Sequence, residues 1–107
     1  MSKESIKRQI EGYKRDIDSQ KAKIANCKED IAKIKIRKSR DTESYGRKLK
    51  SASSTATRHS IRAQKKRDWE SYARQIQREK DQINRYKDRI ISYREDIKRA
   101  RERLKRL

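Results

Sequence analysis

The chain has 107 residues, of which 47% are charged and 30% are apolar, and it contains no proline and no phenylalanine. This composition excludes a thick globular core and argues against sheets, and it is typical of long, solvent-exposed helices. The formal net charge of +18 at pH 7 indicates acidic partners, although it says nothing about the fold.

The first predicted element is a long helix, arm one, over about residues 3–50. Isoleucine recurs at every seventh position, at Ile10, Ile17, Ile24 and Ile31. A second set lies between these, at Ile6, Tyr13, Gln20, Cys27 and Ile34. This alternation of three- and four-residue steps is the a and d pattern of a coiled coil. The next positions are Lys38, Asp41 and Tyr45, so we expect the apolar seam to fail after Ile34.

A turn is predicted over about residues 51–57, where serine and threonine are concentrated. Their side chains hydrogen-bond to nearby backbone and favour turns and helix caps. Gly46 weakens helix formation close by. Tyr45 and Trp69 are not separated by a multiple of seven residues, so one unbroken helix would lose its register between them.

The second predicted helix, arm two, covers about residues 58–107. Its a positions are Trp69, Ile76, Ile83, Ile90 and Ile97, and its d positions are Tyr72, Glu79, Tyr86, Tyr93, Ala100 and Leu107. In an antiparallel pair, a positions of one helix meet d positions of the other. Examples are Ile10 with Ala100 and Ile34 with Ile76. The midpoint of each pair along the sequence is Thr55, which lies inside the predicted turn.

This agreement predicts an all-α fold, an antiparallel two-helix coiled-coil hairpin that forms one domain over residues 1–107. A parallel dimer of bent helices is the alternative. Because a lone hairpin buries little surface, we expect self-association or a partner to complete a helical bundle. Gln20 and Glu79 are polar seam residues that either specify the register or are tolerated near the surface.

Half of the excess charge lies in residues 37–67, where 11 basic residues face only Asp41 and Glu43. We call these cations the basic tip: Arg37, Lys38, Arg40, Arg47, Lys48, Lys50, Arg58, Arg62, Lys65, Lys66 and Arg67. Either the tip contacts an acidic partner, or it is a frayed, solvated helix end with incidental charge.

A second concentration of charge follows the e positions of both arms. We call it the basic edge: Lys7, Lys14, Lys21, Lys28, Lys35, Lys80, Lys87, Arg94 and Arg101, with Ala73 as the exception. In an antiparallel pair these like charges flank one another, which costs a few tenths of a kcal/mol per pair. The edge is therefore predicted to neutralise an acidic strip, either a nucleic-acid backbone or an acidic helix. Ordinary solvated lysine is the alternative, and the opposite edge is mixed in charge.

No residue set here predicts a reaction, so we expect no enzyme, no cofactor and no metal site. His59 and Cys27 are the only histidine and cysteine, and their predicted separation excludes a nucleophile–base pair. No apolar run approaches the ~20 residues that a membrane-spanning helix needs. The polar N-terminus lacks a signal core, so we expect an intracellular protein, cytoplasmic or nucleoid-associated.

Trp69 opens the second seam, opposite Asp41. It either packs in the core or serves as a partly exposed anchor for a partner or a stacked base. The tyrosines at 13, 72, 86 and 93 are assigned to the seam, so other exposed aromatics for base stacking are scarce.

Two helices and a tryptophan near the turn resemble the small helical-hairpin partners of secretion systems. Here Trp69 is followed by Glu70 and Ser71, so their tryptophan–any residue–glycine motif is missing, and no functional residue is carried over. The architecture is also similar to the basic coiled-coil arm of seryl-tRNA synthetases, which contacts structured RNA.

Two hypotheses follow for function. The first is a non-catalytic protein that binds RNA or DNA without sequence specificity through the basic tip and edge. The second is an adaptor or assembly protein that forms a helical bundle with an acidic partner or with itself.

Overall fold

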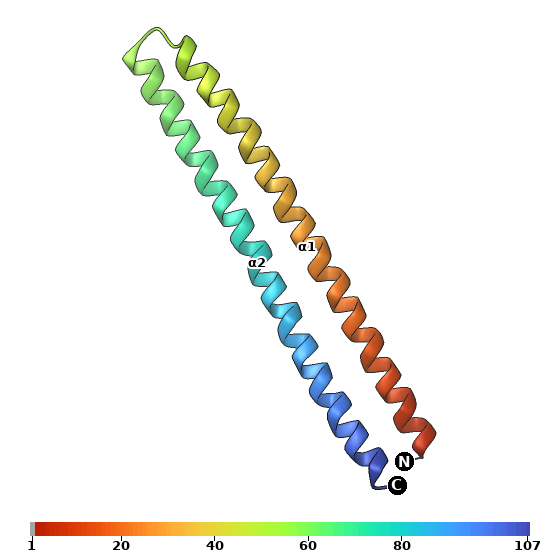
Figure 1. Cartoon of the computed structure of the whole chain (residues 1–107). Coiled ribbons are helices and arrows are strands. Elements are labelled where there is room, and N and C mark those ends of the chain that lie inside the picture. The colour runs from red at the N-terminus through yellow and green to blue at the C-terminus, as the bar shows by residue number, and fades with distance from the viewer. Residues whose placement is uncertain (1) are drawn as a thin grey trace. The chain divides into compact units, whose positions relative to one another are not determined.

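The computed structural model describes residues 2–107, which form two α-helices and no strand. Helix α1 spans Lys3–Ser51 and helix α2 spans Thr55–Lys105 (Figure 1). The two helices pack against each other, so the predicted helical hairpin is confirmed. The chain divides into two compact units, the terminal unit (Met1–Cys27 and Asp81–Leu107) and the turn unit (Lys28–Lys80). In each of them a segment of α1 packs on a segment of α2.

The seam of the terminal unit follows the predicted heptads closely. Its buried residues are Ile6, Ile10, Ile17, Gln20, Ile24 and Cys27 from α1, and Ile83, Ile90, Ile97 and Ala100 from α2. Tyr13 and Tyr93 are half-buried, and their ring centroids lie 6.3 Å apart. The Cys27 thiol donates a hydrogen bond to Gln82 Oε1 over 3.6 Å.

Two details of this unit differ from the sequence prediction. Leu107 was predicted at a d position of the seam, but it is 58% exposed because α2 ends at Lys105. Leu104 is the half-buried leucine at this end of the helix. Gln20 is only 6% exposed, so it is not a near-surface group, and its Oε1 atom accepts no hydrogen bond from residues 2–107.

As predicted, the apolar seam of the turn unit is interrupted after Ile34, at the half-buried polar residues Lys38 and Asp41, but it resumes nearer the turn. Tyr45 is buried, and Leu49 and Ile61 are half-buried. The heptad phase changes, however, because each helix takes two four-residue steps in succession: Asp41, Tyr45 and Leu49 on α1, and Asp68, Tyr72 and Ile76 on α2. Such an insertion locally unwinds a coiled coil and rotates the following residues relative to the seam.

Trp69 illustrates the consequence of this phase change. The prediction that it occupies an a position opposite Asp41 is wrong, because Asp41 pairs with Tyr72 and Trp69 is 38% exposed. Asp68, its chain neighbour, contacts α1 in its place.

The turn itself covers only residues 52–54, and α2 begins at Thr55 rather than near residue 58. Ser54 is the N-cap of α2, since its Oγ accepts a hydrogen bond from the Thr57 backbone N–H over 3.1 Å. The Arg58 guanidinium also donates to the Ala52 carbonyl over 3.3 Å. Helix α1 continues through Gly46 with an ordinary negative φ.

Candidate functional site

The basic tip lies wholly in the turn unit and presents most of its charge to solvent. All of its lysines and arginines are exposed except Lys38 and Lys65, which are half-buried. Among residues 2–107, the ion pairs within 4.0 Å all involve cations outside the tip. Within these residues the tip cations therefore form no ion pair, although Lys48 lies 5.3 Å from the Tyr45 ring centroid and Arg67 donates to Gln64 Oε1 over 2.7 Å.

Two of the nearby carboxylates, those of Asp41 and Asp68, are hydrogen-bonded inside the hairpin. Tyr45 of α1 donates its hydroxyl to Asp68 of α2, and Tyr72 of α2 donates to Asp41 of α1. Gln64 Nε2 donates to the second oxygen of Asp68 over 3.0 Å. Each helix thus supplies one tyrosine and one aspartate to a pair of reciprocal cross-helix bonds.

These bonds raise the pKa values of both tyrosines. The hydrogen bond to Asp68, followed by burial, raises the pKa of Tyr45 from 10.0 to about 12. The hydrogen bond to Asp41, again followed by burial, raises the pKa of Tyr72. Both hydroxyls therefore stay protonated at neutral pH, where they keep the carboxylates bound.

Trp69 lies at the rim of the tip in an open groove of about 570 Å³, which we call the Trp69 groove. The Lys65 ammonium lies 4.4 Å from the indole centroid and the Lys38 ammonium lies 5.1 Å from it. Arg62, Lys66, Glu70 and Ala73 complete the lining.

The basic edge of the terminal unit forms a second groove. Lys14 and Lys21 of α1 and Arg94 and Arg101 of α2 line a volume of about 440 Å³ together with Ile17, Ile97 and Asp18. The structure therefore brings cations from both helices to one surface, over an apolar floor. Lys7 and Lys14 also approach Glu4 and Glu11 of their own helix, at 3.9 and 3.4 Å.

The other members of the basic edge are exposed as well. Lys87 lies in the terminal unit, and Lys28, Lys35 and Lys80 lie in the turn unit. Ala73, the small residue that interrupts the edge, lines the Trp69 groove.

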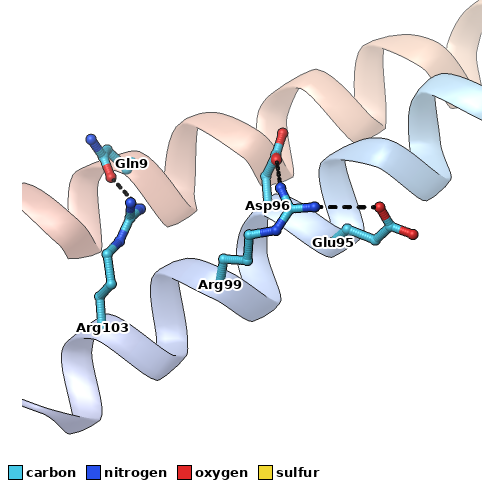
Figure 2. Close-up of polar contacts among 5 residues, drawn as sticks. All are labelled: Gln9, Glu95, Asp96, Arg99 and Arg103. Carbon is cyan, nitrogen blue, oxygen red and sulfur yellow. Dashed lines mark hydrogen bonds and ion pairs between the residues drawn. The ribbon is translucent and has the colours of Figure 1, made fainter.

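Cations on the opposite edge of the terminal unit also contact other groups of the protein. Arg103 donates to Gln9 Oε1 across the helices over 3.2 Å (Figure 2). Arg99 forms ion pairs with Asp96 over 3.1 Å and with Glu95 over 3.7 Å. Both pairs are drawn in Figure 2. Lys23 and Arg89 lie 5.7 and 5.6 Å from the Tyr86 ring centroid.

The pairing of Asp41 and Asp68 with Tyr72 and Tyr45 was not predicted from the sequence. A signal was present, since an aspartate precedes a tyrosine by four residues in both arms, at 41/45 and at 68/72. In an antiparallel hairpin this repeat allows each tyrosine to reach the aspartate of the other helix.

Comparison with protein-family models, curated proteins and solved structures finds no match to this chain. Within residues 2–107, histidine, cysteine, aspartate and glutamate do not gather in groups of three or more that could hold a metal ion. Neither helix contains an apolar stretch long enough to cross a membrane, over the part of the chain that the structure describes.

Proposed function

We propose that this protein binds nucleic acid without sequence specificity and without catalysis, through phosphate contacts from the basic tip and the basic edge. The observation that carries the proposal is the state of the tip. Asp41 and Asp68 are hydrogen-bonded to tyrosines within the hairpin, while no tip cation pairs with a carboxylate among residues 2–107. An unpaired cluster of this sign attracts a polyanion.

The side chains involved favour backbone contacts over base reading. Exposed lysines and arginines on helix surfaces neutralise phosphates, and phosphate contacts carry no sequence information. The terminal-unit groove adds cations from two helices on one face. An intracellular location, cytoplasmic or nucleoid-associated, is part of this proposal.

The non-catalytic part of the proposal is supported by the scarcity of reactive groups. The chain has one cysteine and one histidine, and the Cys27 side chain is only 5% exposed. A buried thiol in an apolar seam acts as a small apolar side chain rather than as a nucleophile.

The salt dependence of affinity tests the phosphate contacts. We expect the logarithm of the association constant for a generic duplex to fall linearly with the logarithm of salt concentration, by about 0.9 per phosphate neutralised. Replacing Arg40 and Arg47 of the tip by glutamine removes two contacts and makes this slope shallower by about 2. Fluorescence anisotropy over a series of salt concentrations measures both.

Arg85→Gln with Arg106→Gln is the matched control, because both arginines are exposed and lie outside the tip and the edge. This control leaves the slope nearly unchanged. If the two double variants weaken binding equally, the tip is not the contact surface. If neither duplex DNA nor structured RNA binds even at low salt, the proposed function is rejected.

The second candidate is an adaptor that completes a helical bundle with an acidic helix or a second copy. It is favoured by Ile36 and Ile91, which are 52% and 54% exposed. It is also favoured by the seam atoms Gln20 Oε1 and Glu79 Oε2, which are buried without a hydrogen bond in the described part of the chain. Light scattering gives the mass in solution. A stable monomer with a sharp melting transition contradicts this candidate, and co-purification with an acidic protein instead of nucleic acid favours it.

A further inference from the structure

The Trp69 groove combines features that a phosphate-binding surface does not need. An indole that is 38% exposed lies among Lys38, Arg62, Lys65 and Lys66, with Glu70 as the one carboxylate of the lining. We propose that this groove binds an unpaired nucleobase by stacking on Trp69, while the surrounding cations hold the phosphates on either side. The inference rests on the proposed function and adds that the preferred ligand is a single strand or an unpaired loop.

The position of Trp69 supports stacking because the structure moves it out of the core. The phase change on α2 turns Asp68 and Tyr72 inward and leaves Trp69 at the rim. The indole is more exposed than any tyrosine of the chain, each of which is half-buried or buried in the seam. At the rim it offers a π surface that every base can stack on, which suits a protein without sequence preference.

Ala73 explains how the groove stays open. The other e positions that make up the basic edge carry lysine or arginine, and Ala73, which interrupts them on α2, lies one turn after Trp69. A long side chain at this position would lie along the groove and cover the indole, because lysine lays its methylenes on apolar surface. The small side chain of Ala73 thus interrupts the basic edge and leaves the indole of Trp69 accessible in the groove.

Lys38 and Lys65 contact the indole in the free protein, so a base must displace at least one of them. An exposed cation–π contact contributes only a few-fold to an equilibrium, whereas one stacked base contributes about fivefold to 150-fold. Each displaced ammonium remains in the groove, where it meets the phosphate next to the base. The exchange therefore favours the nucleic acid.

The charge of the lining selects among possible occupants. Four cations against one carboxylate exclude a cationic ligand such as a methylated lysine, which aromatic sites otherwise bind well. An acidic peptide satisfies the cations, but it offers a flat π surface only where it carries an aromatic side chain. A single-stranded nucleic acid supplies both groups at regular spacing.

The experiment compares three probes of equal length: oligothymidine, the same strand without bases, and a duplex. Trp69 is the single tryptophan, so its emission reports directly on the groove. We expect oligothymidine to quench this emission and to bind about tenfold more tightly than the abasic strand. We expect the abasic strand and the duplex to leave the emission nearly unchanged.

Three variants sharpen the result. Trp69→Ala lowers affinity for oligothymidine about tenfold and leaves affinity for the abasic strand unchanged, and Trp69→Phe restores most of the difference. Ala73→Lys adds a positive charge, yet it weakens oligothymidine binding because it fills the groove, while abasic binding is unchanged or tighter. Circular dichroism confirms that each variant is helical.

The outcomes separate the two proposals. Equal binding of oligothymidine and the abasic strand, with unchanged emission, overturns the base-stacking inference and leaves the proposed function in place. Tighter binding of oligothymidine by Ala73→Lys also overturns the base-stacking inference, since affinity would then depend on positive charge and not on an open groove. Failure of all three probes to bind overturns both proposals.

Discussion

At the scale of single residues, the paired tyrosines and aspartates affect both the stability of the turn unit and the charge at its surface. A carboxylate inside a helix pair is costly unless it is hydrogen-bonded, and Tyr45 and Tyr72 meet this need for Asp68 and Asp41. The same bonds remove the two carboxylates from the surface, where they would otherwise neutralise neighbouring lysines and arginines. Internal stability and external charge are thus set by one group of residues.

Tyr45→Phe tests this arrangement. Loss of the hydroxyl removes a hydrogen bond to a charged group, so we expect the free energy of unfolding to fall by about 1.5–3 kcal/mol at neutral pH. Denaturant unfolding followed by circular dichroism measures the change. Tyr86→Phe is the matched control, because the structure gives the Tyr86 hydroxyl no hydrogen-bond partner within residues 2–107, and its effect stays within about 0.5 kcal/mol.

The same variant has a predicted pH signature. The pKa of Tyr45 is about 12 in the folded protein against an ordinary 10.0, so the folded state holds this proton more tightly than the unfolded state. The stabilisation is complete below pH 10.0 and is lost as the pH rises toward about 12. We expect wild-type protein to lose stability over this range more steeply than Tyr45→Phe, and parallel pH profiles of the two contradict the assignment.

At the scale of the elements, the ends of the helices are set by caps rather than by composition. The serine- and threonine-rich segment was predicted to form a long turn, but only residues 52–54 do so. Ser51 stays helical, with its hydroxyl donating to the Arg47 carbonyl over 2.8 Å, and Ser54 caps α2. Which serine becomes the cap depends on where the second helix must begin to meet the first.

Ser54→Ala tests the cap. The Thr57 N–H loses its acceptor, so we expect the free energy of unfolding to fall by about 1 kcal/mol. Ser53→Ala makes the same change one residue earlier, where the side chain is exposed and has no hydrogen bond within the described residues, and we expect no change beyond about 0.5 kcal/mol. Thermal melts of both variants compare them, and an equal loss in the two would assign the effect to turn composition instead.

At the scale of the whole molecule, net charge acts on stability and on binding in opposite directions. A charge of +18 in 107 residues repels itself, most strongly at the basic tip and along the basic edge. Salt screens this repulsion, since the Debye length falls from about 10 Å at 0.1 M to about 3 Å at 1 M. Salt also weakens phosphate contacts by reducing the gain from counterion release.

We therefore expect the melting temperature to rise as sodium chloride increases from low concentration to about 0.5 M, while affinity for nucleic acid falls over the same range. Thermal melts and anisotropy titrations in the same buffers give the two trends. A melting temperature that is constant or falls with salt would show that like charges on the edge and tip do not oppose folding.

Much of this fold was predictable because heptad periodicity is a property of each helix alone. Ile10, Ile17 and Ile24, together with Ile83, Ile90 and Ile97, lie in the seam as their spacing predicts. The exposed state of the basic edge was predictable in the same way, since e positions flank a seam wherever the heptad holds. The spacing does not identify what the charge binds, so the nucleic-acid hypothesis stays a proposal.

The sequence by itself determined two helices, their antiparallel pairing and the concentration of charge near the turn. Only the tertiary structure decided that the seam changes phase in the turn unit, that Asp41 and Asp68 are bonded to tyrosines, and that Trp69 lies at the rim of a groove. The physical reason is that periodicity along one helix is local, whereas the phase between two helices depends on cross-helix hydrogen bonds and on the length of the turn. Trp69 fits the heptad of its own helix, and it is the bonds of its neighbours Asp68 and Tyr72 that place it outside the core.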